Sequence, residues 1–333
     1  MGVPRRRSTD KGCPGGEGLG RLGSPYLTAH QQHLWLAGHL QACLYTIKNC
    51  MVLQRFQLPK AVPEPTKMRE NLYKVAMYIT GDMKDFRKFM QKKPFLLQLL
   101  EWSLRGLSQV IMVDNPLSGV LILVALILYN PWYTLTTTVG LLSSTLTALI
   151  IGQDSADVSK GVYGFNGALV ALLIAVFSAM GDWYWWLLLP CCFAGASCTL
   201  LFSGLATLLK GWDIPVMVFP FNSALSLYMS ATGPHNLYFP QQHVQPDIVL
   251  AHSNVTDLDL LRLLEGVPLG VGQIFACDDL WACGLILLGV FIFSPLLCVH
   301  ALLGSCVGII TGKHLEHTVK YSGSQVTYMH GVQ

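Results

Sequence analysis

Between Asn115 and Pro246, a stretch of 132 positions, six side chains carry a formal charge, and no other feature constrains the fold as strongly. An average soluble protein has roughly one charged residue in four. A segment with so little charge cannot cover a water-exposed surface, and its long apolar runs are typical of helices that cross a bilayer. The sequence therefore predicts an all-α polytopic membrane protein. The six residues are Asp154, Asp157, Lys160, Asp182, Lys210 and Asp213.

The basic residues are concentrated at one end of the chain. Of the 22 Lys and Arg residues, 17 precede Gly106 and five follow it. Cytoplasmic segments of membrane proteins are enriched in Lys and Arg, so we expect a cytoplasmic N-terminus. A basic region beside a membrane indicates lipid headgroups, and not nucleic acid, as its partner. Residues 1–77 are expected to form a partly disordered N-terminal cytoplasmic region, with one interfacial helix at 33–53.

Residues 78–113 carry lysines and arginines beside leucines and phenylalanines, a pattern that predicts a basic amphipathic helix entering the membrane. Several of the apolar segments that follow are shorter than the roughly 20 residues of a full span. Short or interrupted segments are typical of helices that line a cavity inside a transporter. The segments lie at about 117–130, 133–151, 165–180, 183–209 and 214–231.

The longest polar stretch of the apolar half is 232–265, which contains the glycosylation acceptor Asn254-Val255-Thr256. If the N-terminus is cytoplasmic, an odd number of crossings places this stretch outside the cell. There Asn254 is available for glycosylation. Both the charge asymmetry and the acceptor sequence thus predict an extracellular loop, which we place at 241–267.

An internal repeat relates two segments at a constant offset of 164 positions. Gly106, Gln109 and Asp114 correspond to identical residues at 270, 273 and 278, and matching residues continue to Gly140 and Gly304. An odd number of spans between the copies would make them inverted, with a substrate site between the halves. The second copies of later motifs in the first unit fall at or beyond 328, near the last residue, Gln333. We therefore expect the second repeat to be incomplete.

These segments resemble the urea transporter family from about Tyr78 to Gly312. The resemblance implies an inverted-repeat urea transporter fold with a first repeat at 78–240, a loop at 241–267 and a partial second repeat at 268–312. The cytoplasmic region at 1–77 and the tail at 313–333 lie outside the resemblance. The motifs that carry it are YITGDMK at 78–84, LRGLSQV at 104–110, NPLSG at 115–119, GVYGFNGALV at 161–170, DWYWWLLLP at 182–190, WDIPVMVFPFN at 212–222, ATG at 231–233 and VGQIF at 271–275.

The resemblance further implies passive, channel-like transport of urea across the plasma membrane through one narrow pore per subunit of a trimer. It assigns a pore wall to Phe165 and Leu169, and pore-helix positions to Gln109 and Val110 and to Gln273 and Ile274. The family usually has threonine in the middle of the pore, where this chain has Val218. One hydroxyl acceptor is thereby lost.

Two functions stay open at this point. The chain is either a conducting urea channel, as a homotrimer, or a truncated, non-conducting isoform that joins full-length subunits in a mixed trimer. The sequence has neither the motifs of hydrolases and phosphate-binding enzymes nor metal-ligand spacing. We therefore expect no enzyme activity and no cofactor.

Overall fold

The computed structural model describes residues 78–212, 214–242 and 260–311. Within these ranges the elements are helices, and strand-type pairing is limited to one isolated bridge between Ser178 and Gln241. The all-α prediction agrees with this part of the chain. The helix predicted at 33–53, the acceptor Asn254 and the tail 313–333 lie outside the described residues.

The basic segment forms two helices where the sequence predicted one. Helix α3 spans Lys84–Met90 and helix α4 spans Phe95–Gln109. Pro94 separates them as the extended N-cap of α4, with φ −53° and ψ 150°. Proline lacks an amide hydrogen and disfavours helical backbone at the residue before it, so one continuous helix is broken here.

Two asparagines set the boundaries of the next helices, α5 (Pro116–Tyr129) and α6 (Pro131–Ile150). The Asn115 side chain accepts hydrogen bonds from the amides of Leu117 and Ser118, and the Asn130 side chain does the same for α6. Each helix has proline at its first position, where no amide partner is needed. The predicted break between residues 130 and 131 is therefore confirmed.

Helices α6, α8 (Gly164–Val176) and α9 (Leu188–Leu209) pack against one another and come into direct backbone contact at three glycines. A Cβ on Gly167 would overlap the Gly140 carbonyl, and a Cβ on Gly195 would lie 2.5 Å from the same oxygen. Glycine is thus required where the three backbones meet. The short helix α7 (Ser155–Ser159) precedes α8, and the 3-10 helices η1 (Trp185–Leu187) and η2 (Lys210–Trp212) flank α9.

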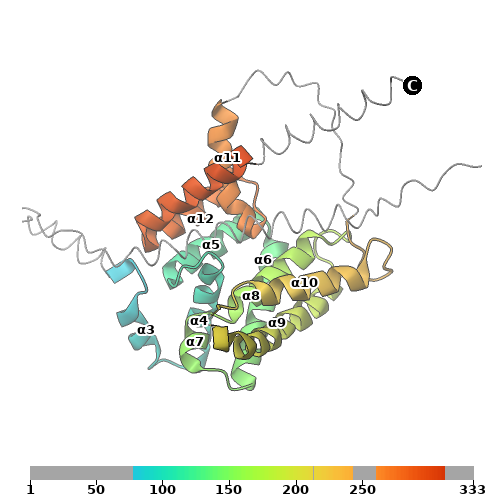
Figure 1. The fold of residues 1–333 in the computed structure, drawn as a ribbon, viewed down its shortest axis with the longest axis horizontal. Coiled ribbons are helices and arrows are strands. Elements are labelled where there is room, and N and C mark those ends of the chain that lie inside the picture. Colours follow the sequence, from blue (N-terminus) through green and yellow to red (C-terminus); the bar gives the residue numbers. More distant parts are fainter. Residues whose placement is uncertain (1–77, 213, 243–259, 312–333) are drawn as a thin grey trace, which may run out of the picture.

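The second part of the chain packs against α5. Helix α11 (Leu260–Gly272) begins within the range predicted as a loop, and η3 (Gln273–Phe275), α12 (Leu280–Phe293) and the helix Pro295–Thr311 follow. The Ser118 hydroxyl on α5 donates to the Gly289 carbonyl on α12 at 2.6 Å. Figure 1 shows α5 and α6 between α12 and the group formed by α8, α9 and α10 (Phe219–Thr232).

Two helical segments of the described ranges, Pro131–Ile150 and Trp185–Trp212, are long and apolar enough to cross a membrane. A third crossing results if Leu264–Phe275 and Leu280–Phe293, which meet at 78°, count as one broken span. Three further apolar helices are shorter, and two of them, Pro116–Tyr129 and Gly164–Val176, lie where the sequence predicted short segments. Such lengths and composition belong to a membrane protein with interrupted helices.

Candidate functional site

The turn after α4 and the turn after η3 have the same backbone conformation. Met112 and Ala276, 164 positions apart, both adopt positive φ, at 59° and 54°. Their amides donate to the carbonyls of Gln109 and Gln273 at 2.9 and 3.0 Å. Non-glycine residues rarely take this conformation. The same uncommon turn therefore ends the α4 segment and the α11–η3 segment.

The helices that follow the two turns also correspond. Helix α5 spans 116–129 and α12 spans 280–293, so both ends are related by the offset of 164. The residues after them, Asn130 and Ser294, are extended, with φ −153° and −158°. Helices α5 and α12 are thus equivalent elements that pack against each other.

Gln109 is the last residue of α4 and carries an unusual polar atom. Its Oε1 is buried and has no hydrogen-bond partner in the part of the chain that the structure describes. Leaving a buried acceptor without a donor costs about 1–3 kcal/mol of stability. The donor for such an atom is usually an ordered water or a ligand. The next residue, Val110, is almost fully buried. The end of α4 thus combines an unused acceptor with an apolar neighbour.

A glycine turn brings the start of α8 against α4. Gly161 has φ +77° and lies so close to the Gly106 backbone that a Cβ there would overlap it. A Cβ on Gly106 would in turn lie 3.5 Å from the Gly164 Cα atom. This close approach places Phe165 and Leu169, both buried in α8, in the same apolar cluster as Val110.

Asn166 fixes the segment that carries Val218. Its Nδ2 donates to the Met217 carbonyl at 3.2 Å, and its Oδ1 accepts from the Phe221 amide at 3.2 Å. Met217 has a positive φ of 51°, and Val218 is the N-cap of α10. One buried amide thus holds both ends of the turn around Val218.

Five of the residues predicted from sequence belong to the large apolar cluster that forms the core of the described structure: Val110, Phe165, Leu169, Val218 and Ile274. Gln109 adds its buried acceptor at the end of α4. The side chain of Gln273 is exposed, in contrast to the pairing with Gln109 that the repeat suggests.

Sequence reasoning marked Asn166 only as part of the motif at 161–170 and gave it no role of its own, although one signal for it was present. It is the polar residue in the run 164–176, where every other side chain is apolar or absent. A buried amide in such a run needs partners. The partners lie more than 50 positions away, so the sequence alone did not reveal them.

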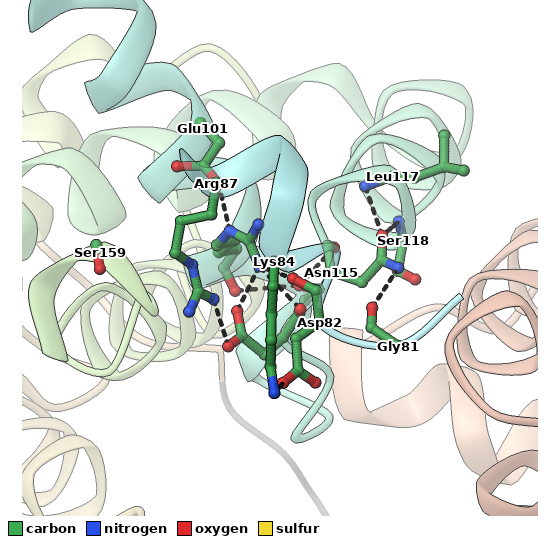
Figure 2. A network of polar contacts seen from close by, with 12 residues as sticks. Gly81, Asp82, Lys84, Arg87, Glu101, Asn115, Leu117, Ser118 and Ser159 are labelled. Carbon is green, nitrogen blue, oxygen red and sulfur yellow. Dashed lines mark hydrogen bonds and ion pairs between the residues drawn. The ribbon is translucent and has the colours of Figure 1, made fainter. Parts of the chain in front are cut away.

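A buried charge network beside the site was also missed (Figure 2). Arg105 is fully buried on α4 and pairs with Glu101 at 2.5 Å and with Asp114 at 2.7 Å. Arg87 of α3 binds the other oxygen of Asp114 at 2.6 Å. The signal was a glutamate and an arginine, four positions apart, within an otherwise uncharged helix.

The network extends to the backbone before α3. Arg105 donates to the Asp82 carbonyl, and the Asn115 amide donates to the carbonyls of Ile79 and Gly81, each at 2.8 Å (Figure 2). The Gly81 amide donates in turn to the Phe293 carbonyl at the end of α12. These contacts fix the turn after α4 relative to both α5 and α12.

The cluster of predicted site residues has a definite chemistry. These six residues comprise an unpaired amide oxygen, one aromatic ring and aliphatic side chains, and none of the six is ionisable. Among the described residues no group of three His, Cys, Asp or Glu side chains is arranged to hold a metal ion. The unpaired oxygen can accept a hydrogen bond, and the six side chains offer no charged group.

Comparison with known proteins identifies the family. The profile of the urea transporter family matches residues 100–325. Urea transporter 1 of Mus musculus is 45% identical over 243 residues, which cover 73% of this chain and 63% of the mouse protein. Urea transporter 1 of Capra hircus is 47% identical over 250 residues, 74% of this chain and 65% of the goat protein.

The chain thus spans somewhat less than two thirds of the length of these relatives. The profile match covers the α4 turn, α8, the Val218 segment and the α11–α12 segment, and so includes every described residue of the candidate site. Over this region the chain is a member of the urea transporter family.

Proposed function

We propose that the chain provides a passive, channel-like path for urea across a membrane. The observation that carries this proposal is the buried Oε1 of Gln109, which has no partner among the described residues and belongs to the residue before Val110 of the apolar cluster. The names of the relatives, urea transporter 1 from mouse and goat, indicate urea as the substrate.

Urea has the chemistry that such a site would accept. It is planar and uncharged, and its four N–H bonds lose their water partners when it enters a narrow path. A fixed amide oxygen offsets part of that loss. The apolar walls give a hydrated ion no comparable compensation, because an unpaired charge in a low-dielectric medium costs far more. The path therefore favours neutral donors over ions.

The decisive experiment reconstitutes the purified full chain into liposomes and measures urea efflux by stopped-flow light scattering. We expect efflux well above that of empty liposomes, proportional to the urea gradient and unchanged by imposed sodium or proton gradients. Efflux equal to that of empty liposomes would overturn the conducting function. Efflux that arises only after addition of a urea transporter 1 chain would instead favour an associating, non-conducting subunit.

The role of Gln109 is tested in the same assay with Gln109→Leu. Loss of one net hydrogen bond of about 0.5–1.5 kcal/mol is expected to lower efflux by up to about tenfold. Gln91→Leu is the matched control, because Gln91 has the same side chain but is exposed outside the cluster. Equal efflux from both variants would remove Gln109 from the path.

We place Val218 in the path as well, beside Phe165 and Leu169. Threonine and valine have nearly the same shape, so Val218→Thr adds an acceptor with little change in packing. We expect up to about a tenfold rise in urea efflux. If Val218 faces a neighbouring helix, the hydroxyl would bond to its own backbone, and efflux would stay unchanged.

We further infer that the two equivalent segments form inverted halves with the path between them, and that Gln273 and Ile274 line it opposite Gln109 and Val110. With the offset of 164, Ser118 corresponds to Ala282 and Gly289 corresponds to Ala125. A two-fold relation between the halves therefore turns the Ser118–Gly289 contact into an Ala282–Ala125 contact. Both alanines are buried, which supports this arrangement. A trimer is the proposed assembly, and the mass of the purified complex tests it.

The proposed location is the plasma membrane, with a cytoplasmic N-terminus and an extracellular Asn254. The support is the concentration of 17 of the 22 basic residues before Gly106. In cells, glycosidase treatment should reduce the mass of the chain, and Asn254→Gln should abolish that reduction. A mass change that persists in Asn254→Gln would place the sugar elsewhere.

A further inference from the structure

The corner between α3 and α4 combines exposed lysines with exposed apolar side chains. Lys84 and Lys88 on α3 are each 76% exposed, and exposed Lys92 and half-buried Lys93 follow in the turn before Pro94. The large apolar residues on the same corner that are more than two fifths exposed are Phe89, Phe95, Leu96, Leu97 and Leu100. We call these nine residues the α3–α4 corner.

The basic charge of the corner is not neutralised by the protein. Lys84 and Lys88 have carboxylate partners in Asp82 and Asp85, at 3.6 Å, but both contacts are solvent-exposed and therefore weak. Lys93 lies over the Phe89 ring at 4.4 Å, which orders its ammonium group without removing its charge. The positive charge of four lysines is thus opposed by the negative charge of two exposed aspartates, which leaves the corner positively charged.

The one cation of α3 that points inward explains why the corner has a fixed shape. Arg87 is only 17% exposed and binds Asp114 at 2.6 Å. Arg105 and Asn115 hold the backbone of residues 79–82 from the other side (Figure 2). Helix α3 is therefore anchored by its inner face while its lysines project outward.

We propose that the α3–α4 corner is a binding surface for anionic phospholipid headgroups at the membrane boundary. Such a boundary presents negative charge and acyl chains at neighbouring depths, which matches lysines that adjoin exposed leucines. Trp102, packed edge-on against Phe95, is a residue type that is enriched at that depth. An acidic soluble protein would match the lysines but would leave the leucines in water.

This surface does not depend on what the path conducts, so it is tested without a transport assay. The full chain is reconstituted in phosphatidylcholine vesicles that contain a trace of spin-labelled phosphatidylserine or spin-labelled phosphatidylcholine. The motionally restricted fraction of each label is then measured by electron paramagnetic resonance. We expect a larger restricted fraction for phosphatidylserine, which declines as salt is added because exposed charges are screened.

Three matched double variants locate the effect. Lys84→Gln/Lys88→Gln and Lys92→Gln/Lys93→Gln should each lower the preference for phosphatidylserine, by about fivefold per lysine at most. Lys160→Gln/Lys210→Gln removes the same charge from elsewhere in the chain and should leave the preference intact. Equal restriction of both labels in the parent chain, or the same loss in all three variants, would overturn the proposal.

A benzophenone crosslinker attached in place of the Leu96 side chain identifies the occupant directly. Illumination should join it to lipid, and mass spectrometry should detect the added mass. Adducts mainly with a second copy of the chain would show that the corner is a contact between subunits and would also overturn the proposal.

Discussion

The α4–α5 and α11–α12 segments share a backbone but differ in the side chains that surround it. In the first, Asp114 lies between Arg105 and Arg87, and Asn115 caps α5. In the second, Asp278 accepts a hydrogen bond from the Tyr129 hydroxyl at 2.9 Å, and the α12 N-cap makes no side-chain bond.

This difference shows what determines the turn. Leu269 occupies the position that corresponds to Arg105, and Glu265, the counterpart of buried Glu101, is exposed. The turn at Ala276 nevertheless reproduces the turn at Met112. The backbone hydrogen bonds and the residue of positive φ therefore suffice for the turn, and the charges of the first copy serve to anchor it to α3.

The largest effect is expected from Arg105→Leu, which gives the first copy the residue of the second. Glu101 would remain buried without its partner, and breaking such a buried pair costs about 3–5 kcal/mol. The midpoint of thermal unfolding of the chain in detergent should fall strongly. Arg105→Leu/Glu101→Leu should recover part of the loss, since no buried charge is then left unpaired on α4. A single variant as stable as the parent would mean that the network does not anchor the turn.

The next largest effects are expected from two glycines at the helix crossings. In the α4–α5 crossing the glycine, Gly119, is on the second helix, and in the α11–α12 crossing the glycine, Gly272, is on the first helix. A Cβ on Gly119 would overlap the backbone of Leu104, whereas a Cβ on Gly272 would overlap the Cys283 sulfur. Gly119→Ala and Gly272→Ala should each destabilise the chain, by about 1–3 kcal/mol. Adding Cys283→Gly should rescue Gly272→Ala, because the obstacle there is a side chain. If Gly272→Ala/Cys283→Gly unfolds no later than Gly272→Ala, the two crossings are not built as described.

A smaller effect distinguishes the two N-caps. Asn115→Ala removes the cap of α5, which is worth about 0.5–2 kcal/mol, and leaves the Ile79 and Gly81 carbonyls without that donor. Asp279→Ala, at the corresponding position of α12, removes no cap bond and should change stability by less than about 0.5 kcal/mol. Guanidine unfolding in detergent can compare the pair, and equal destabilisation would contradict the assigned difference.

The smallest effect is expected from the hydrogen bond between Tyr129 and Asp278. In the α11–α12 segment this bond stands where the α4–α5 segment has its charge network. Tyr129→Phe removes the hydroxyl that binds Asp278, at an exposed site, so we expect a loss of about 0.5–1 kcal/mol. Tyr133→Phe is the control, because Tyr133 packs beside Tyr129 but makes no hydrogen bond to Asp278 in the described structure. A larger loss in Tyr133→Phe would place the contact between the copies elsewhere.

Local signals in the sequence predicted the helix boundaries well. The expected break at 130–131 is an asparagine followed by a proline, and both act within a few residues. The expected single helix over 78–113 was wrong because its apolar pattern continues through the break, and the weight of Pro94 was underestimated. Capping and proline effects are local, which is why they can be identified without a structure.

The site divides in the same way. Burial of Val110, Phe165, Leu169 and Val218 followed from apolar residues in recognisable motifs. The hydrogen bonds of Asn166 to residues 217 and 221 did not, since they depend on how α8 and α10 meet in space. Long-range contacts of a single polar side chain have no periodic signature in sequence.

The meeting of Gly140, Gly167 and Gly195 has a mechanical consequence. Where backbones touch directly, no side-chain rotamer can change to absorb a relative movement of the helices. We therefore expect helices α6, α8 and α9 to move as one stiff body that carries Phe165 and Leu169 with it. A movement that changes the distance between these two residues and their neighbours must then come from the elements packed around that body. Those elements are α4, α10 and the α5–α12 pair.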